Sequence, residues 1–225
     1  MNVDWGWVER WRGYFRDWYE VGGVEEKVAE ASRLACRHLD DGMISVSGGK
    51  DSMAVLHIIV NSCGRKDVNV FHLDYAHLMP REVEREVLEN IRSVAPQANL
   101  IVKRYQRPPG VYAAERTEVY AAVSNLGFLY HLLGIRADES SKRRARGRVA
   151  DRGRWVVVHP IYDFTWRDVW AYVFEHRVPV PETYFAYAKL VGWDKVRFVT
   201  FFDKRFERYG SPQLDGVLAW RLREL

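Results

Sequence analysis

A glycine-rich turn between a short apolar strand and a helix is the feature that most constrains how this chain can fold. The turn reads Ser45-Val46-Ser47-Gly48-Gly49-Lys50-Asp51-Ser52, and the apolar run from Met53 to Val60 follows it. Because glycine has no Cβ, the backbone can curl at Gly48 and Gly49 and direct its N–H groups at one point. The start of the helix adds positive dipole character. The pattern predicts a strand–loop–helix unit that binds phosphate.

The side chains of this loop favour binding over a purely structural turn. Ser47 and Ser52 offer hydroxyl donors, and Asp51 is expected to cap backbone N–H groups or to share a cation with the ligand. The alternative is a Gly-Gly turn with Ser and Asp as ordinary helix caps. The loop also differs from the G-x-x-x-x-G-K-[ST] phosphate loop, because its glycines are adjacent and an acid follows the lysine.

Short apolar strands alternate with helices along the rest of the chain. After the first short strand, which leads into the glycine-rich loop, we expect strands at 69–73, 100–102, 128–133 and 155–158. Helices are expected at 51–62, from Pro80 to about 95, and at 115–125. This order predicts an α/β fold, Rossmann-like and doubly wound, with a mainly parallel five-stranded sheet and helices on both faces. Ligands bind such sheets beyond the carboxyl ends of the strands, where Ser47, Asp74 and Gly134 fall.

Aromatic residues at helical spacing mark the N-terminal segment. Trp7, Trp11, Phe15 and Trp18 predict an amphipathic helix over 4–20 that docks on the core, with contact to a protein partner as the alternative. Gly22-Gly23 ends it, and a second helix is expected over 24–39. We therefore divide the chain into an N-terminal helix (1–23), a nucleotide-binding domain (24–186) and a basic helical tail (187–225).

Composition narrows the class of protein. The 225 residues have a formal net charge of +4, which suits anionic ligands. Neither a membrane span nor a signal peptide is recognisable, so we expect a cytoplasmic protein. The two cysteines, Cys36 and Cys63, have no metal-ligand spacing, so no iron–sulfur cluster is expected. We expect ordinary buried or half-buried thiols; a disulfide between them is the alternative, but nothing in the sequence supports it.

A second group of polar residues follows the fourth expected strand. Gly134 permits a sharp turn or a close backbone approach, and Arg136 suits bidentate binding of an oxyanion. Asp138 and Glu139 could form ion pairs that hold the arginines in place, cap a helix or bind magnesium. Seven cations then crowd residues 142–154. Taken alone, this segment would be a solvated surface loop.

Three motifs in this order resemble one family. The string from Ser45 to Ser52 resembles the PP-loop of the ATP pyrophosphatases, and Gly134 to Arg148 resembles the second signature of PP-loop ATP sulfurylases. The third is Thr165-Trp166-Arg167-Asp168-Val169-Trp170 with Pro181 to Ala186, which we interpret as mainly structural, with Thr165 and Asp168 as a capping box. The chain is thus similar to the PAPS reductase/ATP sulfurylase family, nearest in motifs to the ATP sulfurylase catalytic subunit. That resemblance implies an adenine nucleotide alpha hydrolase-like fold.

The resemblance also implies a ligand and site residues. The ligand is ATP, adenylyl sulfate or PAPS, with Mg²⁺ at Asp51 and a small oxyanion as second substrate. The residues expected to bind the nucleotide are Ser45, Ser47, Gly48, Gly49, Lys50, Asp51, Ser52, Asp74 and Gly134. The catalytic residues would be Lys50, Asp51 and Arg136. The anion would be bound by Arg136, Arg143, Arg144 and Arg148, and Arg143 and Arg144 compete for one family position.

The lack of a cysteine in residues 187–225 helps to decide which of the family's reactions to expect. PAPS reductases use a cysteine near the C-terminus, and residues 187–225 contain none, so the nucleophile for reduction is missing. We therefore expect adenylyl transfer from ATP to an anionic acceptor such as sulfate, with release of pyrophosphate. The alternatives are a PAPS or adenylyl-sulfate reductase-like protein without its cysteine, a sulfur-inserting nucleic-acid modification enzyme that uses the basic run, and a non-catalytic nucleotide-binding subunit docked through the Trp-rich helix. Tyr75-Ala76-His77 departs from the family pattern after Asp74 and leaves the nucleotide open, and His72, His77 and His159 are expected to be structural.

Overall fold

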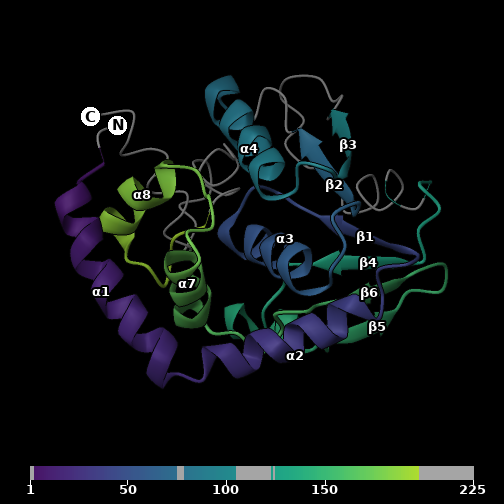
Figure 1. The fold of residues 1–225 in the computed structure, drawn as a ribbon, viewed down its shortest axis with the longest axis horizontal. Coiled ribbons are helices and arrows are strands. Elements are labelled where there is room, and N and C mark those ends of the chain that lie inside the picture. Colours follow the sequence, from purple (N-terminus) through teal and green to yellow (C-terminus); the bar gives the residue numbers. More distant parts are fainter. Residues whose placement is uncertain (1–2, 75–78, 105–122, 124, 198–225) are drawn as a thin grey trace.

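The structure, a computed structural model, describes residues 3–74, 79–104, 123 and 125–197. Helices and strands alternate along this part of the chain (Figure 1). In order, they are α1 (Trp5–Val21), α2 (Val24–Cys36), β1 (Gly42–Ser45), α3 (Lys50–Ser62), β2 (Asn69–Asp74), α4 (Arg81–Val94), β3 (Asn99–Arg104), β4 (Tyr130–Leu133), the 3₁₀ turn η2 (Ala137–Glu139), α6 (Ser141–Arg144), β5 (Val149–Asp151), β6 (Val156–Val158), α7 (Trp166–Glu175) and α8 (Thr183–Val191).

The strands form one sheet in the order β3-β2-β1-β4-β6-β5. The first five of these are mutually parallel, and β5 pairs antiparallel with β6 at the edge. The Rossmann-like, mainly parallel fold is confirmed, but the expected number of five strands is wrong because the described residues already form six. The strand that sequence reasoning missed is β5, a three-residue segment inside the basic run. The fourth strand is also shorter than expected, since it begins at Tyr130.

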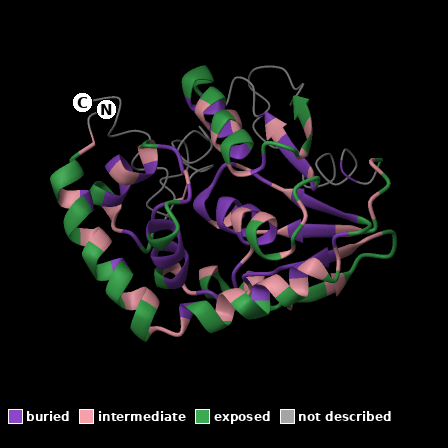
Figure 2. Cartoon of the chain, in the orientation of Figure 1, coloured by how far each residue is buried: buried purple, intermediate pink, exposed green. Residues whose placement is uncertain are grey.

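Both faces of the sheet are buried, because alternate residues of its central strands enter different clusters (Figure 2). Ile44 and Val70 join the main core with the helices, whereas Met43 and Phe71 pack in a second cluster with Val123. The helix expected at 115–125 lies almost wholly outside the described residues.

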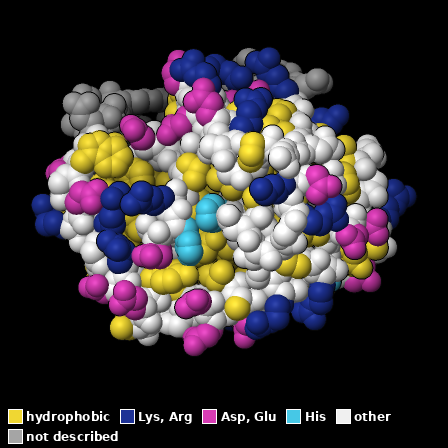
Figure 3. All heavy atoms as spheres, in the orientation of Figure 1, with side chains coloured by type: hydrophobic (Ala, Val, Ile, Leu, Met, Phe, Trp, Pro, Cys, Tyr) yellow, Lys and Arg dark blue, Asp and Glu magenta, His cyan; other side chains and the backbone are white. Residues whose placement is uncertain are grey.

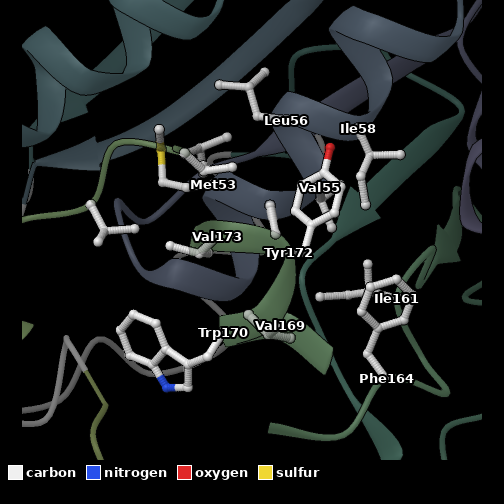
Figure 4. Close-up of a cluster of buried hydrophobic side chains, with 14 of the residues drawn as sticks. Met53, Val55, Leu56, Ile58, Ile161, Phe164, Val169, Trp170, Tyr172 and Val173 are labelled. Carbon is white, nitrogen blue, oxygen red and sulfur yellow. The ribbon is translucent and has the colours of Figure 1, made fainter. Parts of the chain in front are cut away.

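Helix α3 is buried along most of its length, and α7 packs beside it (Figure 4). Met53, Val55 and Leu56 of α3 lie in one apolar cluster with Trp170 and Val173 of α7. Burial of each large apolar side chain contributes about 1.5–3 kcal/mol. The core therefore fixes α3, and with it the loop that precedes α3.

The N-terminal helix docks on α7, as expected. Phe15 is fully buried and stacks on Phe174 with a ring-centroid distance of 5.3 Å. Trp18 donates a hydrogen bond of 2.9 Å to Asp168, the third residue of α7, whose side chain also bonds the backbone N–H of the N-cap residue Thr165. Docking within the chain is thus observed, whereas the boundary at residue 23 and contact with a protein partner stay predictions.

One expectation about the cysteines is wrong. Cys36, the last residue of α2, and Cys63, at the end of α3, form a disulfide with a Cα–Cα distance of 5.3 Å. The packing of α2 against α3 brings the two residues together, and their spacing in the sequence does not reveal this. Among the described helices, none has the length and apolar character needed to cross a membrane.

Candidate functional site

The glycine-rich loop connects β1 to α3, as the sequence predicts, and Gly48 has two reasons to be glycine. Its φ is +82°, in the left-handed region that side chains rarely adopt. A Cβ at this position would also lie 2.5 Å from both γ-methyl groups of Val87 on α4. The loop is therefore pressed directly onto α4.

The two loop serines bind the loop's own backbone in this structure. The Ser52 hydroxyl donates to the carbonyl of Gly49 at 2.9 Å and accepts from the N–H of Ser47 at 3.2 Å. The Ser47 hydroxyl accepts from the N–H of Gly49 at 3.3 Å. These bonds hold the curl of the loop without a ligand, and hydroxyl donation to phosphate stays a prediction. Ser45 is the last residue of β1 and positions the loop.

Gly134 provides the close approach that its sequence position suggested. It directly follows β4, the neighbour of β1 in the sheet. A Cβ on Gly134 would lie 2.7 Å from the carbonyl carbon of Asp51 and 2.7 Å from the nitrogen of Ser52. Since these are backbone atoms in the first turn of α3, no larger residue fits without separating the two segments. This contact brings the residues after β4 against the start of α3.

Asp51 lies between two cations at this junction. Arg136 donates from Nε to Asp51 Oδ1 at 2.5 Å, and Lys50 donates from Nζ to Asp51 Oδ2 at 2.8 Å. Arg136 and Lys50 are only 3% and 2% exposed. Burial alone would raise the pKa of Asp51, but the charges of Arg136 and Lys50 outweigh burial and hold that pKa well below its usual range. The structure thus brings together the three residues to which the family resemblance assigned catalysis.

Lys50 points toward an aromatic pair. Its ammonium nitrogen lies 5.9 Å from the ring centroid of Trp170 and 5.8 Å from that of Tyr184. Burial lowers the pKa of Lys50, while Asp51 opposes the shift. The Tyr184 hydroxyl also accepts the backbone N–H of Lys50 at 3.2 Å. Sequence reasoning interpreted the segment that contains Trp170 and Tyr184 as mainly structural and did not predict their contact with this lysine.

The structure separates the two arginines that compete for one position. Arg143 pairs with Glu139, four residues earlier, whose side chain is 5% exposed, whereas Arg144 is exposed and its carbonyl accepts from Tyr162. Burial lowers the pKa of Arg143, and Arg197 lowers it further while Glu139 opposes both effects. Neighbouring residues of the short helix α6 point in different directions, so of these two arginines it is Arg143 that shares the Glu139 carboxylate with the backbone N–H of Arg136.

Two further arginines differ from expectation. Arg148 forms ion pairs with Glu30 and Asp163, and not with Glu139, which binds Arg136 and Arg143. Arg197 does bind Glu139, because its guanidinium donates to the Glu139 carbonyl at 3.4 Å. Apart from its charge, no feature of Arg197 in the sequence pointed to this position.

Asp74 lies at the end of β2, on the other side of the loop from Gly134 in the strand order. It is buried, and Arg81 of α4 donates to its two carboxylate oxygens at 2.8 and 3.1 Å. Burial with these bonds fixes the carboxylate at the carboxyl edge of the sheet. The unusual Tyr75-Ala76-His77 stretch lies outside the described residues.

Comparison with known proteins places the chain in a family. The sequence profile described as the phosphoadenosine phosphosulfate reductase domain matches residues 42–197, which include the loop, Asp74, Arg136 and Arg143. No curated protein sequence matches the chain.

Two solved structures are similar in fold. The FMN adenylyltransferase of Candida glabrata is 12% identical with a TM-score of 0.55, and the match covers 77% of this chain and 65% of that enzyme, less than two thirds of its length. A phosphate complex of phosphoadenylyl-sulfate (PAPS) reductase from Candida auris is 20% identical with a TM-score of 0.49, covering 75% of this chain and 88% of the other. With the profile match over most of the chain and the PP-loop fold, the protein belongs to the phosphoadenosine phosphosulfate reductase domain family.

Proposed function

We propose that this protein transfers the adenylyl group of ATP to a small anionic acceptor and releases pyrophosphate, with sulfate as the first acceptor to test. The observation that carries the proposal is the junction of the glycine-rich loop with the Gly134–Arg136 segment, where Arg136 lies 2.5 Å from Asp51. An adenine nucleotide held by the loop would present its α-phosphate beside an arginine that suits an oxyanion.

The reaction needs no protein nucleophile. An acceptor oxygen forms a bond to the α-phosphorus, the bond between that phosphorus and the bridging oxygen breaks, and pyrophosphate leaves. Arg136 and Arg143 would orient the acceptor, and backbone N–H groups of the loop would bind the β- and γ-phosphates. Lys50, buried and bonded to Asp51, would act through that carboxylate. Positioning and charge stabilisation then supply the rate enhancement.

Magnesium fits this site only as an ion shared with the nucleotide. The described residues contain no group of three or more His, Cys, Asp or Glu side chains suited to a metal. Asp51 offers a hard carboxylate oxygen, and Mg²⁺ at nucleotide sites is usually held by one or two carboxylates together with phosphates and water. When bound, the ion would supply positive charge to the triphosphate.

Other family reactions receive less support. Both cysteines of the 225-residue sequence are joined in the Cys36–Cys63 disulfide, so reduction through a cysteine nucleophile lacks its thiolate. Binding of nucleic acid through the basic run is disfavoured because Arg143 and Arg148 are paired with acids. On the face drawn in Figure 3, basic and acidic side chains are interspersed.

The test is pyrophosphate release from ATP with and without sulfate. We expect acceptor-dependent release, with Asp51→Asn and Arg136→Lys each lowering kcat on the order of 10²-fold. Arg144→Gln is the matched control, because Arg144 is basic, nearby and exposed, and this variant should retain activity. If wild-type protein releases no pyrophosphate with any oxyanion and calorimetry detects no heat with ATP, the proposal is wrong.

A further inference from the structure

Helix α4 contacts the candidate site through three residues spaced three apart. Arg81 pairs with Asp74, Glu84 hydrogen-bonds to His72 of β2 at 2.8 Å, and Val87 packs against Gly48 of the loop. Residues three apart lie on one face of a helix, so a single helical face contacts the end of β2 and the glycine-rich loop. Figure 1 shows α4 beside these segments.

His72 fixes the point at which the loop begins. It is fully buried, and its Nδ1 lies 2.7 Å from the carbonyl oxygen of Val46, the residue between β1 and Ser47. A carbonyl only accepts hydrogen bonds, so Nδ1 must carry a proton and donate it. The other ring nitrogen, Nε2, then faces Glu84.

One proton lies between His72 and Glu84 in either arrangement. The pair is either a neutral imidazole with a carboxylic acid or an imidazolium with a carboxylate, and its net charge is zero in both cases. Both side chains are 0% exposed. Oε2 of Glu84 is also buried without a hydrogen-bond partner among the described residues. Such an atom costs stability, and apolar residues would fill the same space without that cost.

We propose that His72 and Glu84 are positioning residues for the phosphate loop. The His72 ring binds the Val46 carbonyl at the start of the loop, and Glu84 ties that ring to α4. Because Arg81 of the same helix binds Asp74, the loop and Asp74 are held in one relative geometry. The loop would contact the phosphates, and Asp74 would contact the rest of the nucleotide. Neither residue touches substrate. This inference rests on the proposed function for its ligand, an adenine nucleoside triphosphate, but the loop geometry that it explains exists without ligand.

The test compares two substitutions of one residue. Glu84→Gln keeps the size, and its amide can donate to Nε2 of His72, whereas Glu84→Met keeps the volume and removes the hydrogen bond. We expect Glu84→Met to raise the Kd for ATP at least 10-fold and Glu84→Gln to change it less than 3-fold. His131→Leu is the matched control, because His131 is also a buried strand histidine but stacks on Trp155. This control should bind ATP like wild type.

Hydrogen exchange in ligand-free protein supplies the second readout. Glu84→Met should speed amide exchange in peptides covering 46–49 at least 10-fold, whereas Glu84→Gln and His131→Leu should not. The inference is overturned if Glu84→Met leaves exchange in the loop unchanged, if Glu84→Gln matches it, or if the His131 control shows the same gain. Should wild-type protein bind no ATP, the proposed function fails, and the exchange experiment still decides the positioning role.

Discussion

Removing the Cys36–Cys63 disulfide should lower stability without altering the site. The two cysteines are 27 positions apart, and the segment between them contains β1, the glycine-rich loop and all of α3. In the chain-entropy model, a loop of this length restricts the unfolded chain by about 3.5 kcal/mol at 25 °C. For a chain of this size, that loss corresponds to a fall in Tm of roughly 7–14 °C. Because the effect arises in the unfolded chain, folded-state properties should remain.

The assay is urea unfolding followed by tryptophan fluorescence. Oxidised wild type is compared with a variant carrying both Cys36→Ser and Cys63→Ser, and with wild type kept in reductant. The variant and the reduced wild type should unfold at the same lower urea concentration, with a larger m-value because their unfolded chain exposes more surface. Affinity for ATP should stay within 2-fold. If the double variant lost less than about 0.5 kcal/mol, the entropic account of this crosslink would be refuted.

Three other perturbations test separate contacts. Burial lowers the pKa of His57 to about 4, so the free energy of unfolding should fall by roughly 1–3 kcal/mol as the pH drops from 6.5 to 4. The urea midpoint should therefore change less with pH in His57→Gln than in wild type. An equal change in both proteins would contradict the assignment. Tyr184→Phe removes the acceptor of the Lys50 N–H and should cost about 1 kcal/mol in thermal unfolding. Phe15→Ala should cost about 3–5 kcal/mol, whereas the exposed Tyr14→Ala should change the unfolding free energy by less than about 0.5 kcal/mol.

Local patterns predicted the parts of the fold that depend on neighbouring residues. Apolar runs followed by glycine, serine or aspartate predicted that Asp74 and Gly134 lie at strand ends, and the structure places them there. The expected start of α3 was off by one residue, since the helix begins at Lys50. Thr165 and Asp168 form the expected capping box. Each of these features follows from backbone chemistry within a few residues.

Features that depend on distant segments could not be predicted. β5 is only three residues long and becomes a strand because β6 is available for pairing. The disulfide depends on how α2 packs against α3. The choice of Arg143 over Arg144 follows from the buried side chain of Glu139, and Arg197 enters the site from far along the chain. Residue spacing in the sequence does not predict these contacts between distant segments.

The carboxylates at the candidate site have a consequence for selectivity. Asp51 and Glu139 already serve as internal counter-ions for Arg136, Lys50 and Arg143. An arriving anion must therefore compete with a bound carboxylate for these cations instead of meeting an unpaired charge. Chloride, with one diffuse charge, competes poorly for such occupied positions, whereas a multiply charged oxyanion competes well. The site should thus favour multiply charged oxyanions over chloride.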